Sequence, residues 1–188
     1  MELASTRIIP APVDMVWAAL NDPEMLRGCV PGCETIAADG ENAYRITLAA
    51  KVGPVSAKFA GRMQLSDIDP QCAYTLSFEG QGGAAGFAKG EAKVALAPEA
   101  NGTGTALSYA VNAQVGGKIA QLGSRLVDGA AQKLADDFFG RFADAVAAKA
   151  GVPPAPVQRR AGMPRWQVIL LVIIIADIIF WLWTYWGR

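Results

Sequence analysis

The segment 107–149 reads LSYAVNAQVGGKIAQLGSRLVDGAAQKLADDFFGRFADAVAAK, and its hydrophobic period changes once along its length. Apolar residues first alternate with polar ones, as in a strand with one buried face: Leu107, Tyr109, Val111, Ala113 and Val115. They then recur every three or four residues, as in an amphipathic helix: Ile119, Leu122, Leu126, Ala130, Leu134, Phe138, Phe142 and Ala145. The segment therefore predicts a strand, a turn at Gly116 and Gly117, and one long helix over about 118–149.

Upstream of this segment, the chain predicts an antiparallel sheet. Alternation with period two recurs in four further segments with turn residues between them: 44–48, 55–65, 72–78 and 92–96. Before these, residues 2–9 predict a strand and 11–20 a short helix with Pro12 in its first turn. Asn21 or Asp22 can cap a second short helix that extends to Arg27.

These elements predict an α+β fold in which the long helix covers the buried face of a curved antiparallel sheet. Several inward positions of that sheet hold small residues: Ala57, Gly61, Gly90, Ala92 and Ala113. Small residues under a long helix either leave a cavity or let the sheet and the helix approach more closely. Both alternatives remain open at this point.

The C-terminal part predicts a membrane anchor on a linker. Residues 166–186 are an apolar run with a single charge, Asp177, and as a helix they span about 30 Å, the thickness of a bilayer core. Tryptophans suited to the membrane interface lie towards its ends: Trp166, Trp181, Trp183 and Trp186. Asp177 either contacts another membrane helix or is tolerated in protonated form.

The same part of the chain predicts the orientation in the membrane. Arginines are more numerous before the run than after it, and no signal peptide is recognisable at the N-terminus, so we expect a single-pass protein of the cytoplasmic (inner) membrane with its N-terminal domain in the cytoplasm. Residues 151–165 contain four prolines and predict an extended linker. The expected organisation is a domain over 1–150, a linker over 151–165 and an anchor over 166–186.

The composition excludes several classes of function. The chain has no histidine, which excludes Ser-His-Asp and Cys-His catalysis and histidine metal ligation. Lys+Arg and Asp+Glu balance at 17 each, so no basic excess indicates nucleic acid. The cysteines Cys29, Cys33 and Cys72 have neither zinc-site nor redox-pair spacing and predict reduced thiols. We therefore predict no catalytic residues and no metal.

Two glycine-rich segments resemble nucleotide-binding loops only loosely. The run 80–85, GQGGAA, matches the dinucleotide pattern, but a strand-like segment follows it instead of a helix, which favours a hairpin turn. The run 116–119, GGKI, lacks the first glycine and the Ser/Thr of a phosphate loop and predicts the turn between strand and helix.

The order of elements resembles the helix-grip fold of the START/Bet v 1-like (SRPBCC) superfamily, and within it the carbon monoxide dehydrogenase G-subunit family. The resemblance covers roughly residues 1–150. It is carried by Pro10–Trp17 (PAPVDMVW), 22–26 (DPEML), 29–34 (CVPGCE), 51–55 (KVGPV), Gly61, 80–90, 115–125 (VGGKIAQLGSR) and 136–139 (DDFF). Some members of the family carry an anchor after a variable linker, as this chain does.

The resemblance implies an accessory role beside a molybdenum hydroxylase of the carbon monoxide dehydrogenase type, which the protein recruits to the membrane. It also implies an apolar ligand, and a quinone (menaquinone or ubiquinone) or similar lipid would link the enzyme to the respiratory chain. The expected cavity-lining residues are Phe59, Leu76, Phe78, Phe87, Tyr109, Ile119, Leu122 and Leu126. We expect Lys118 and Arg125 to dock the partner. The alternatives are recruitment without a ligand and a cavity enzyme of the cyclase or lyase type.

Overall fold

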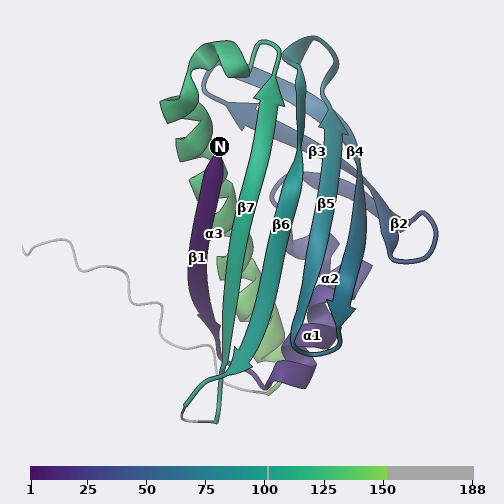
Figure 1. Ribbon diagram of the computed structural model, residues 1–188, viewed down its shortest axis with the longest axis vertical. Helices are drawn as coiled ribbons and strands as arrows, with labels where there is room; N and C mark the ends of the chain where they lie inside the picture. Colours follow the sequence, from purple (N-terminus) through teal and green to yellow (C-terminus); the bar gives the residue numbers. More distant parts are fainter. Residues whose placement is uncertain (101, 152–188) are drawn as a thin grey trace, which may run out of the picture. The chain divides into compact units, whose positions relative to one another are not determined.

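The structure, a computed structural model, describes residues 1–100 and 102–151, all of which belong to the compact unit Met1–Pro154. Along the chain, the described residues form a strand, two short helices, six strands and a long helix (Figure 1). Their bounds are β1 Glu2–Ile9, α1 Val13–Leu20, α2 Pro23–Cys29, β2 Cys33–Ala38, β3 Ala43–Val52, β4 Val55–Asp69, β5 Ala73–Gln81, β6 Phe87–Pro98, β7 Thr105–Gly116 and α3 Ser124–Lys149. Two single 3₁₀ turns, η1 Gly83–Ala85 and η2 Ala120–Leu122, lie in the connections.

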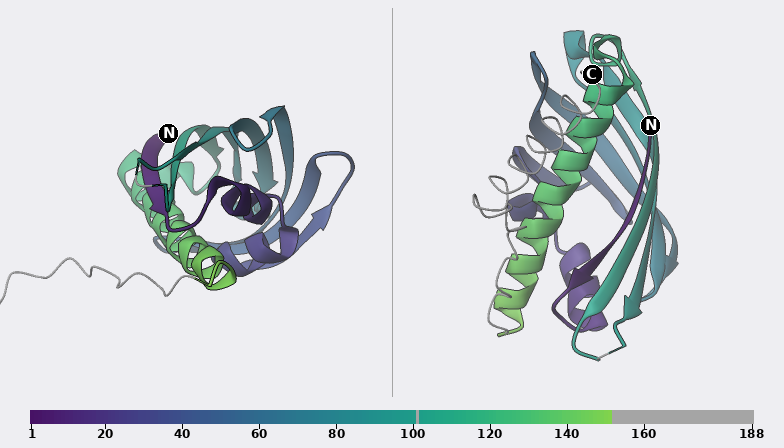
Figure 2. Two further views of the ribbon diagram at one scale, coloured as in Figure 1. Left: turned by 90° about the horizontal axis from the view of Figure 1, so that it is seen from below. Right: turned by 90° about the vertical axis from the view of Figure 1, so that its left-hand side faces the viewer.

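The strands of the described part form one antiparallel sheet in the order β1-β7-β6-β5-β4-β3-β2. The sheet is strongly curved, and α3 lies along its open side, while α1 and α2 occupy one end (Figure 2). The predicted α+β class, with an antiparallel sheet and a long C-terminal helix in a helix-grip arrangement, is confirmed.

Strand β2 is absent from the sequence prediction. It is a short edge strand, and Ile36 is its only buried residue within the span Cys33–Ala38. Its pairing with β3 is also irregular between Cys33 and Thr35. A period-two pattern needs several apolar residues on one face, and an edge strand with one buried side chain does not provide it.

The long helix starts later than its sequence pattern predicts. The prediction placed its start near Lys118, but α3 begins at Ser124, after the separate turn η2. Gly123 between them has φ +87°, a left-handed conformation that glycine adopts without steric cost. Ile119 and Leu122 keep the helical spacing in the sequence because η2 turns in the same sense, but they do not belong to α3.

The predicted cap of the second helix is present at Asp22. Its carboxylate accepts hydrogen bonds from the backbone N–H groups of Glu24 (3.0 Å) and Met25 (3.3 Å). These are two of the N–H groups that have no partner inside the helix.

We expect Asp22→Ala to lower the free energy of unfolding by about 1 kcal/mol, because the capping bonds are lost. Asp22→Asn is the matched control: asparagine caps equally well but removes the charge that faces Lys149 at 3.7 Å. Urea denaturation of the three proteins separates these effects, and equal losses for both variants would contradict the capping role.

The packed core lies at the end of the sheet that holds α1 and α2. Its fully buried side chains come from every layer: Ile9 of β1, Val16 of α1, Leu107 of β7, and Phe142 and Val146 of α3. Phe142 stacks on Phe138 at a centroid distance of 5.7 Å, and Trp17 meets Tyr74 edge-on at 5.8 Å. These contacts fix the second half of α3 against the sheet.

The predicted linker and anchor, 151–165 and 166–186, lie outside the described residues apart from Gly151. That includes Trp166, Asp177, Trp181, Trp183 and Trp186. Within 1–100 and 102–151, no helix is both long enough and apolar enough to cross a bilayer.

Candidate ligand-binding site

The interior of the domain is closed in one half and open in the other. Strand alternation and register direct a set of apolar side chains of β3, β4 and β5 to the helix side of the sheet, and none of them is fully buried: Leu48, Val52, Val55, Ala57, Phe59 and Phe78. We call the space beside these six residues the open half of the interior. Their incomplete burial shows that solvent reaches the inner face there.

The helix shows the same division. The buried residues of α3 are Phe142, Val146 and Ala147, all in its C-terminal half, and none lies between Ser124 and Arg141. In the N-terminal half, Leu126 is 51% and Leu134 41% exposed. Val127, Ala131 and Ala135 lie on the same side of the helix as the buried Phe142 and are only partly buried, so the helix packs less tightly on the sheet in this half.

The β3–β4 hairpin bounds one end of this half. Gly53 at the hairpin tip has φ +55°, and a Cβ added there would come within 3.9 Å of Leu122 Cδ1 and 4.0 Å of Leu126 Cδ1. The hairpin tip and the start of α3 therefore face each other through apolar atoms. We refer to this place as the mouth of the open half.

The structure separates the predicted lining residues into groups. Phe59 and Phe78 face the open half, and Leu122 and Leu126 lie at its mouth. Phe59 is held by Gly82, because a Cβ at Gly82 would come within 2.4 Å of the Phe59 ring. Leu76 and Tyr109 pack against the core cluster or belong to it, and Ile119 is buried in the β7–α3 connection. Four of the predicted residues thus border the open half or its mouth.

Phe87 lies on the opposite face of the sheet. Ala92, Val94 and Leu96 of β6 are buried on the inner face, so alternation along the strand turns Phe87 outward. Its ring lies over Gly116, its outward-facing partner on β7, and 36% of the residue is exposed. The alternation of β5 cannot be continued to Phe87 because the glycine-rich run 82–86 lies between them. Counting back from Leu96 along β6 gives the correct, outward face for Phe87.

A polar seam that the sequence analysis missed joins β1 to α3. Arg7 of the edge strand pairs with the carboxylate of Asp136, which also accepts a hydrogen bond from Gln132 (3.1 Å). Tyr109 stacks on Phe139 at 4.8 Å, and its hydroxyl group and Arg7 Nε are buried without a hydrogen-bond partner among the described residues. Burial tends to lower the pKa of Arg7, but Tyr109 and Asp136 raise it overall. The sequence contained a signal for this seam. In the strand 2–9, Arg7 lies two residues before the buried Ile9, and residues two apart share a face of the sheet, so Arg7 faces inward.

Tyr74 is a buried polar residue of the closed half. Burial, with a smaller contribution from Tyr44, raises its pKa to about 12 from an ordinary value of 10. The neutral phenol is therefore the form that the fold stabilises.

We expect the domain to lose stability between pH 10 and 12 in proportion to this shift. Below pH 10, Tyr74 is protonated in both the folded and the unfolded state, so it causes no pH dependence. Above pH 10, the unfolded state releases the proton first, and roughly 3 kcal/mol is lost by the time the folded state also ionises. Urea denaturation of wild type and Tyr74→Phe at several pH values tests this. The difference in the free energy of unfolding between the two proteins should change with pH only above pH 10. Parallel curves would contradict it.

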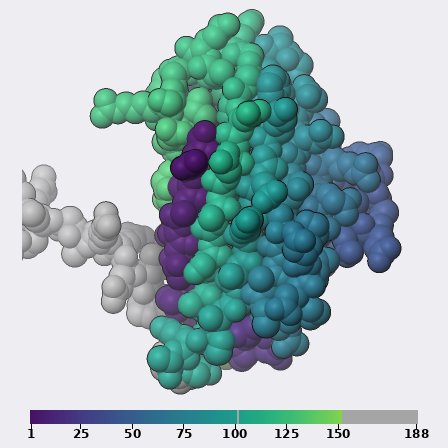
Figure 3. Space-filling model, in the orientation of Figure 1, coloured from purple at the N-terminus to yellow at the C-terminus, as the bar shows by residue number. Residues whose placement is uncertain are grey.

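Two shallow, open depressions of about 810 Å³ each lie on the outer face of the sheet. Figure 3 shows this face. Charged and amide side chains line much of the first, among them Arg62, Glu79, Lys89 and Glu91. Such a lining does not suit an apolar molecule. We therefore take the open half of the interior, and not the first depression, as the candidate site for an apolar ligand.

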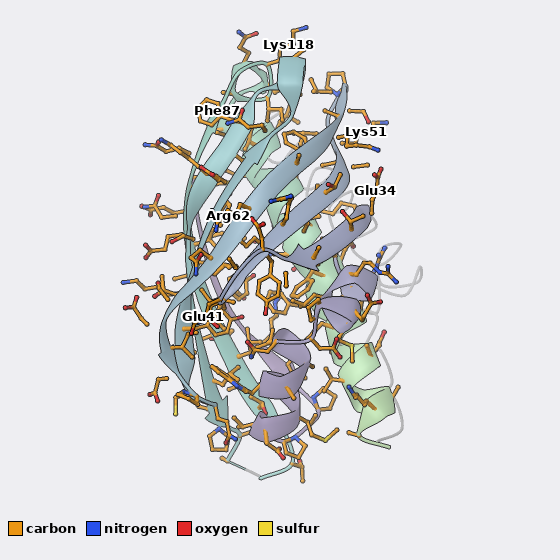
Figure 4. The ribbon with its side chains drawn as sticks, turned by 90° about the vertical axis from the view of Figure 1, so that its right-hand side faces the viewer. Glu34, Glu41, Lys51, Arg62, Phe87 and Lys118 are labelled. Carbon is orange, nitrogen blue, oxygen red and sulfur yellow. The ribbon has the colours of Figure 1, made fainter. Side chains whose placement is uncertain are left out.

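The two predicted docking residues lie at the same end as the mouth. Lys118 is exposed in the β7–α3 connection, at the end of the domain where Lys51 and Phe87 also lie (Figure 4). Arg125 is exposed in the first turn of α3. The glycine-rich runs have the predicted roles: residues 82–86 connect β5 and β6 as an antiparallel hairpin, and Gly117, with φ +80°, lies in the turn after β7.

A curved antiparallel sheet around one long helix, with a partly open apolar interior, defines the START/Bet v 1-like class of domain. A model of the carbon monoxide dehydrogenase G-subunit (CoxG) family matches residues 6–147. The chain therefore belongs to this family.

Solved structures share the fold. A conserved protein from Geobacillus kaustophilus is 32% identical with a TM-score of 0.75, and the match covers 79% of this chain and 97% of that protein. A protein from Thermus thermophilus is 20% identical with a TM-score of 0.61, covering 80% and 99% of the two chains. The Zhui aromatase/cyclase from Streptomyces sp. R1128 is 13% identical with a TM-score of 0.58, covering 87% and 99%, which shows a shared fold only. No curated protein matches the chain.

Proposed function

We propose that this chain is a membrane-anchored accessory protein that holds a quinone or a similar apolar lipid in the open half of its interior. It recruits a molybdenum hydroxylase of the carbon monoxide dehydrogenase type to the cytoplasmic membrane and links it to the respiratory chain through the quinone, menaquinone or ubiquinone. Membership of the CoxG family supports the accessory role. The apolar run 166–186 supports the anchor.

The observation that carries the ligand proposal is the exposed apolar interior. Six apolar residues on the inner face of the sheet are incompletely buried, and so are Val127, Ala131 and Ala135 on the sheet-facing side of the helix. Exposed apolar surface of this kind is favourable to cover, at about 25 cal/mol for each Å² removed from water. An isoprenoid chain covers such a surface and needs few polar partners.

The proposed role is that of a carrier and not of a catalyst. The inward polar positions of the described strands β3, β5 and β7 include the tyrosines Tyr44, Tyr74 and Tyr109, and the raised pKa of Tyr74 makes this phenol a poor base near neutral pH. In this account the redox chemistry belongs to the quinone and to the partner enzyme, and specificity for the oxidised substrate belongs to the partner.

We expect a chain that ends at Pro154 to keep its ligand and to leave the membrane. The complete chain should bring the hydroxylase into the membrane fraction, and the shortened chain should bring neither itself nor the enzyme there. Fractionation of cells that express the enzyme with either form measures this. If the shortened chain still carries the enzyme into the membrane fraction, the recruitment proposal is wrong. If the complete chain recruits the enzyme but contains no lipid, recruitment without a ligand is the correct alternative.

A further inference from the structure

The two ends of the domain differ in charge. Three segments, each a connection with the adjoining ends of its strands or helix, come together at the mouth of the open half: residues 51–57, 81–88 and 116–127. We call them the hairpin end. They contain Lys51, Lys118 and Arg125 and no Asp or Glu. At the opposite end, the segments 21–22, 67–72 and 98–104 contain Asp22, Asp67, Asp69 and Glu99, and the cation beside them, Lys149, pairs with Asp22.

The three connections of the hairpin end are joined in the structure. The backbone N–H of Ile119 donates to the carbonyl oxygen of Ala85 at 3.0 Å, which links the β7–α3 connection to the β5–β6 connection. The hairpin tip at Gly53 faces Leu122 and Leu126. Lys51, Phe87 and Lys118 accordingly lie at one end of the domain in Figure 4.

The cations of the hairpin end are available for a partner. Lys51, Lys118 and Arg125 are exposed, and no salt bridge joins them to a carboxylate among the described residues. By contrast, Lys58, one residue beyond the hairpin segment, pairs with Glu34 at 2.7 Å. The exposed Asp128, one helical turn after Arg125, partly offsets the charge of that arginine, so the attraction by this end comes mainly from Lys51 and Lys118.

Exposed apolar groups accompany these cations. Phe87 is 36% and Leu126 51% exposed, and Pro54 is exposed at the hairpin tip. Apolar groups among Lys and Arg are the combination by which proteins bind the interface of an anionic bilayer. Two of the three cations are lysines, which are depleted in protein–protein interfaces but bind anionic lipid headgroups well.

We propose that the hairpin end docks on an anionic lipid bilayer and applies the mouth of the open half to the membrane surface. A lipid dissolved in the bilayer then enters the interior at this end, past Gly53, Leu122 and Leu126, without crossing water. This inference deepens the proposed function and rests on it for the identity of the ligand, but binding to the bilayer itself is independent of any ligand.

The domain without the apolar run is the suitable material for the test. The described residues have their own core, and the similar protein from Geobacillus kaustophilus is matched over 97% of its length by 79% of this chain, so a protein consisting of this domain alone folds. The chain ending at Pro154 is mixed with sedimentable vesicles of phosphatidylcholine, with or without 30% phosphatidylglycerol, and the bound fraction is measured.

The decisive variant is Lys51→Gln/Lys118→Gln/Arg125→Gln. The matched control, Lys93→Gln/Lys133→Gln/Arg141→Gln, also removes two lysines and one arginine but lies away from the hairpin end. We expect wild type and control to bind the anionic vesicles, and the hairpin-end variant to bind about 100-fold more weakly, from roughly fivefold for each cation. Phe87→Ala should weaken binding further, and 0.5 M NaCl should weaken the binding of wild type.

Two results of the vesicle assay would overturn the inference: equal binding of wild type to both vesicle compositions, or an equal loss of vesicle binding in the two triple variants. A third would be a hairpin-end variant that loses binding to the purified hydroxylase but not to vesicles. That result would assign the hairpin end to an acidic protein surface. The quinone content of the same preparations is measured separately. Vesicle binding without quinone would leave this inference intact and refute the proposed ligand. Quinone without vesicle binding would support the proposed ligand and refute this inference.

Discussion

Replacing Phe142 by alanine is expected to destabilise the domain by about 3–5 kcal/mol, the usual cost of removing a large buried aromatic side chain. Phe142 is 0% exposed and stacks on Phe138, so the vacated space lies in the closed half of the interior. Because single domains are stable by only about 5–15 kcal/mol, this loss is a large part of the total.

The matched substitution in the open half is Leu126→Ala. Leu126 belongs to the same helix but is 51% exposed, and we expect a loss below about 1 kcal/mol. Urea unfolding of the chain ending at Pro154 can be followed by the fluorescence of Trp17, the one tryptophan before residue 155, which packs on Tyr74. Similar losses for Phe142→Ala and Leu126→Ala would show that the first half of α3 is packed in solution, and the open half would not exist.

The second large effect concerns access to the open half. We expect Ala57→Trp to reduce the binding of apolar ligands at least tenfold, because the indole occupies space between β4 and the helix. Ala57 faces inward opposite Ala50, so two small side chains leave room there without a change of the backbone. Filling an open space should leave stability unchanged or raise it slightly, since no packed side chain is displaced.

Ala60→Trp is the control on the same strand. Ala60 faces outward and is exposed, so its indole does not enter the interior. Binding is measured by the fluorescence increase of a hydrophobic dye and its displacement by ubiquinone. If both tryptophan variants bind like wild type, the ligand does not occupy the open half. If Ala57→Trp unfolds while Ala60→Trp does not, the space beside Ala57 is already filled by protein.

Local patterns predicted most of the fold. The alternation in 107–115 and the change of period after Gly117 were enough to predict β7 and most of α3. Asp22 indicated the start of α2 correctly. The edge strand β2 was missed because Ile36 is its only buried residue, and the break at Gly123 was missed because the 3₁₀ turn keeps Leu122 in phase with the helix.

The candidate site was only partly predictable, because it depends on distances between elements. Strand parity places Phe59 and Phe78 inward and Phe87 outward, and counting back from Leu96 along the same strand gives the face of Phe87. Whether an inward residue lines a space or packs in a core depends on how far α3 lies from the sheet, and no local pattern encodes this separation. The seam formed by Arg7 and Asp136 likewise joins residues 129 positions apart in the chain.

The most direct test of the account is a lipid analysis of the protein as isolated from its own membranes. The complete chain and the form ending at Pro154 are extracted with organic solvent, and quinones are quantified by mass spectrometry against protein. The account predicts close to one quinone per chain in both forms, as expected for one occupied site, and far less in Ala57→Trp. Wild-type protein with no more quinone than Ala57→Trp would contradict the central claim that the open half of the interior holds this ligand.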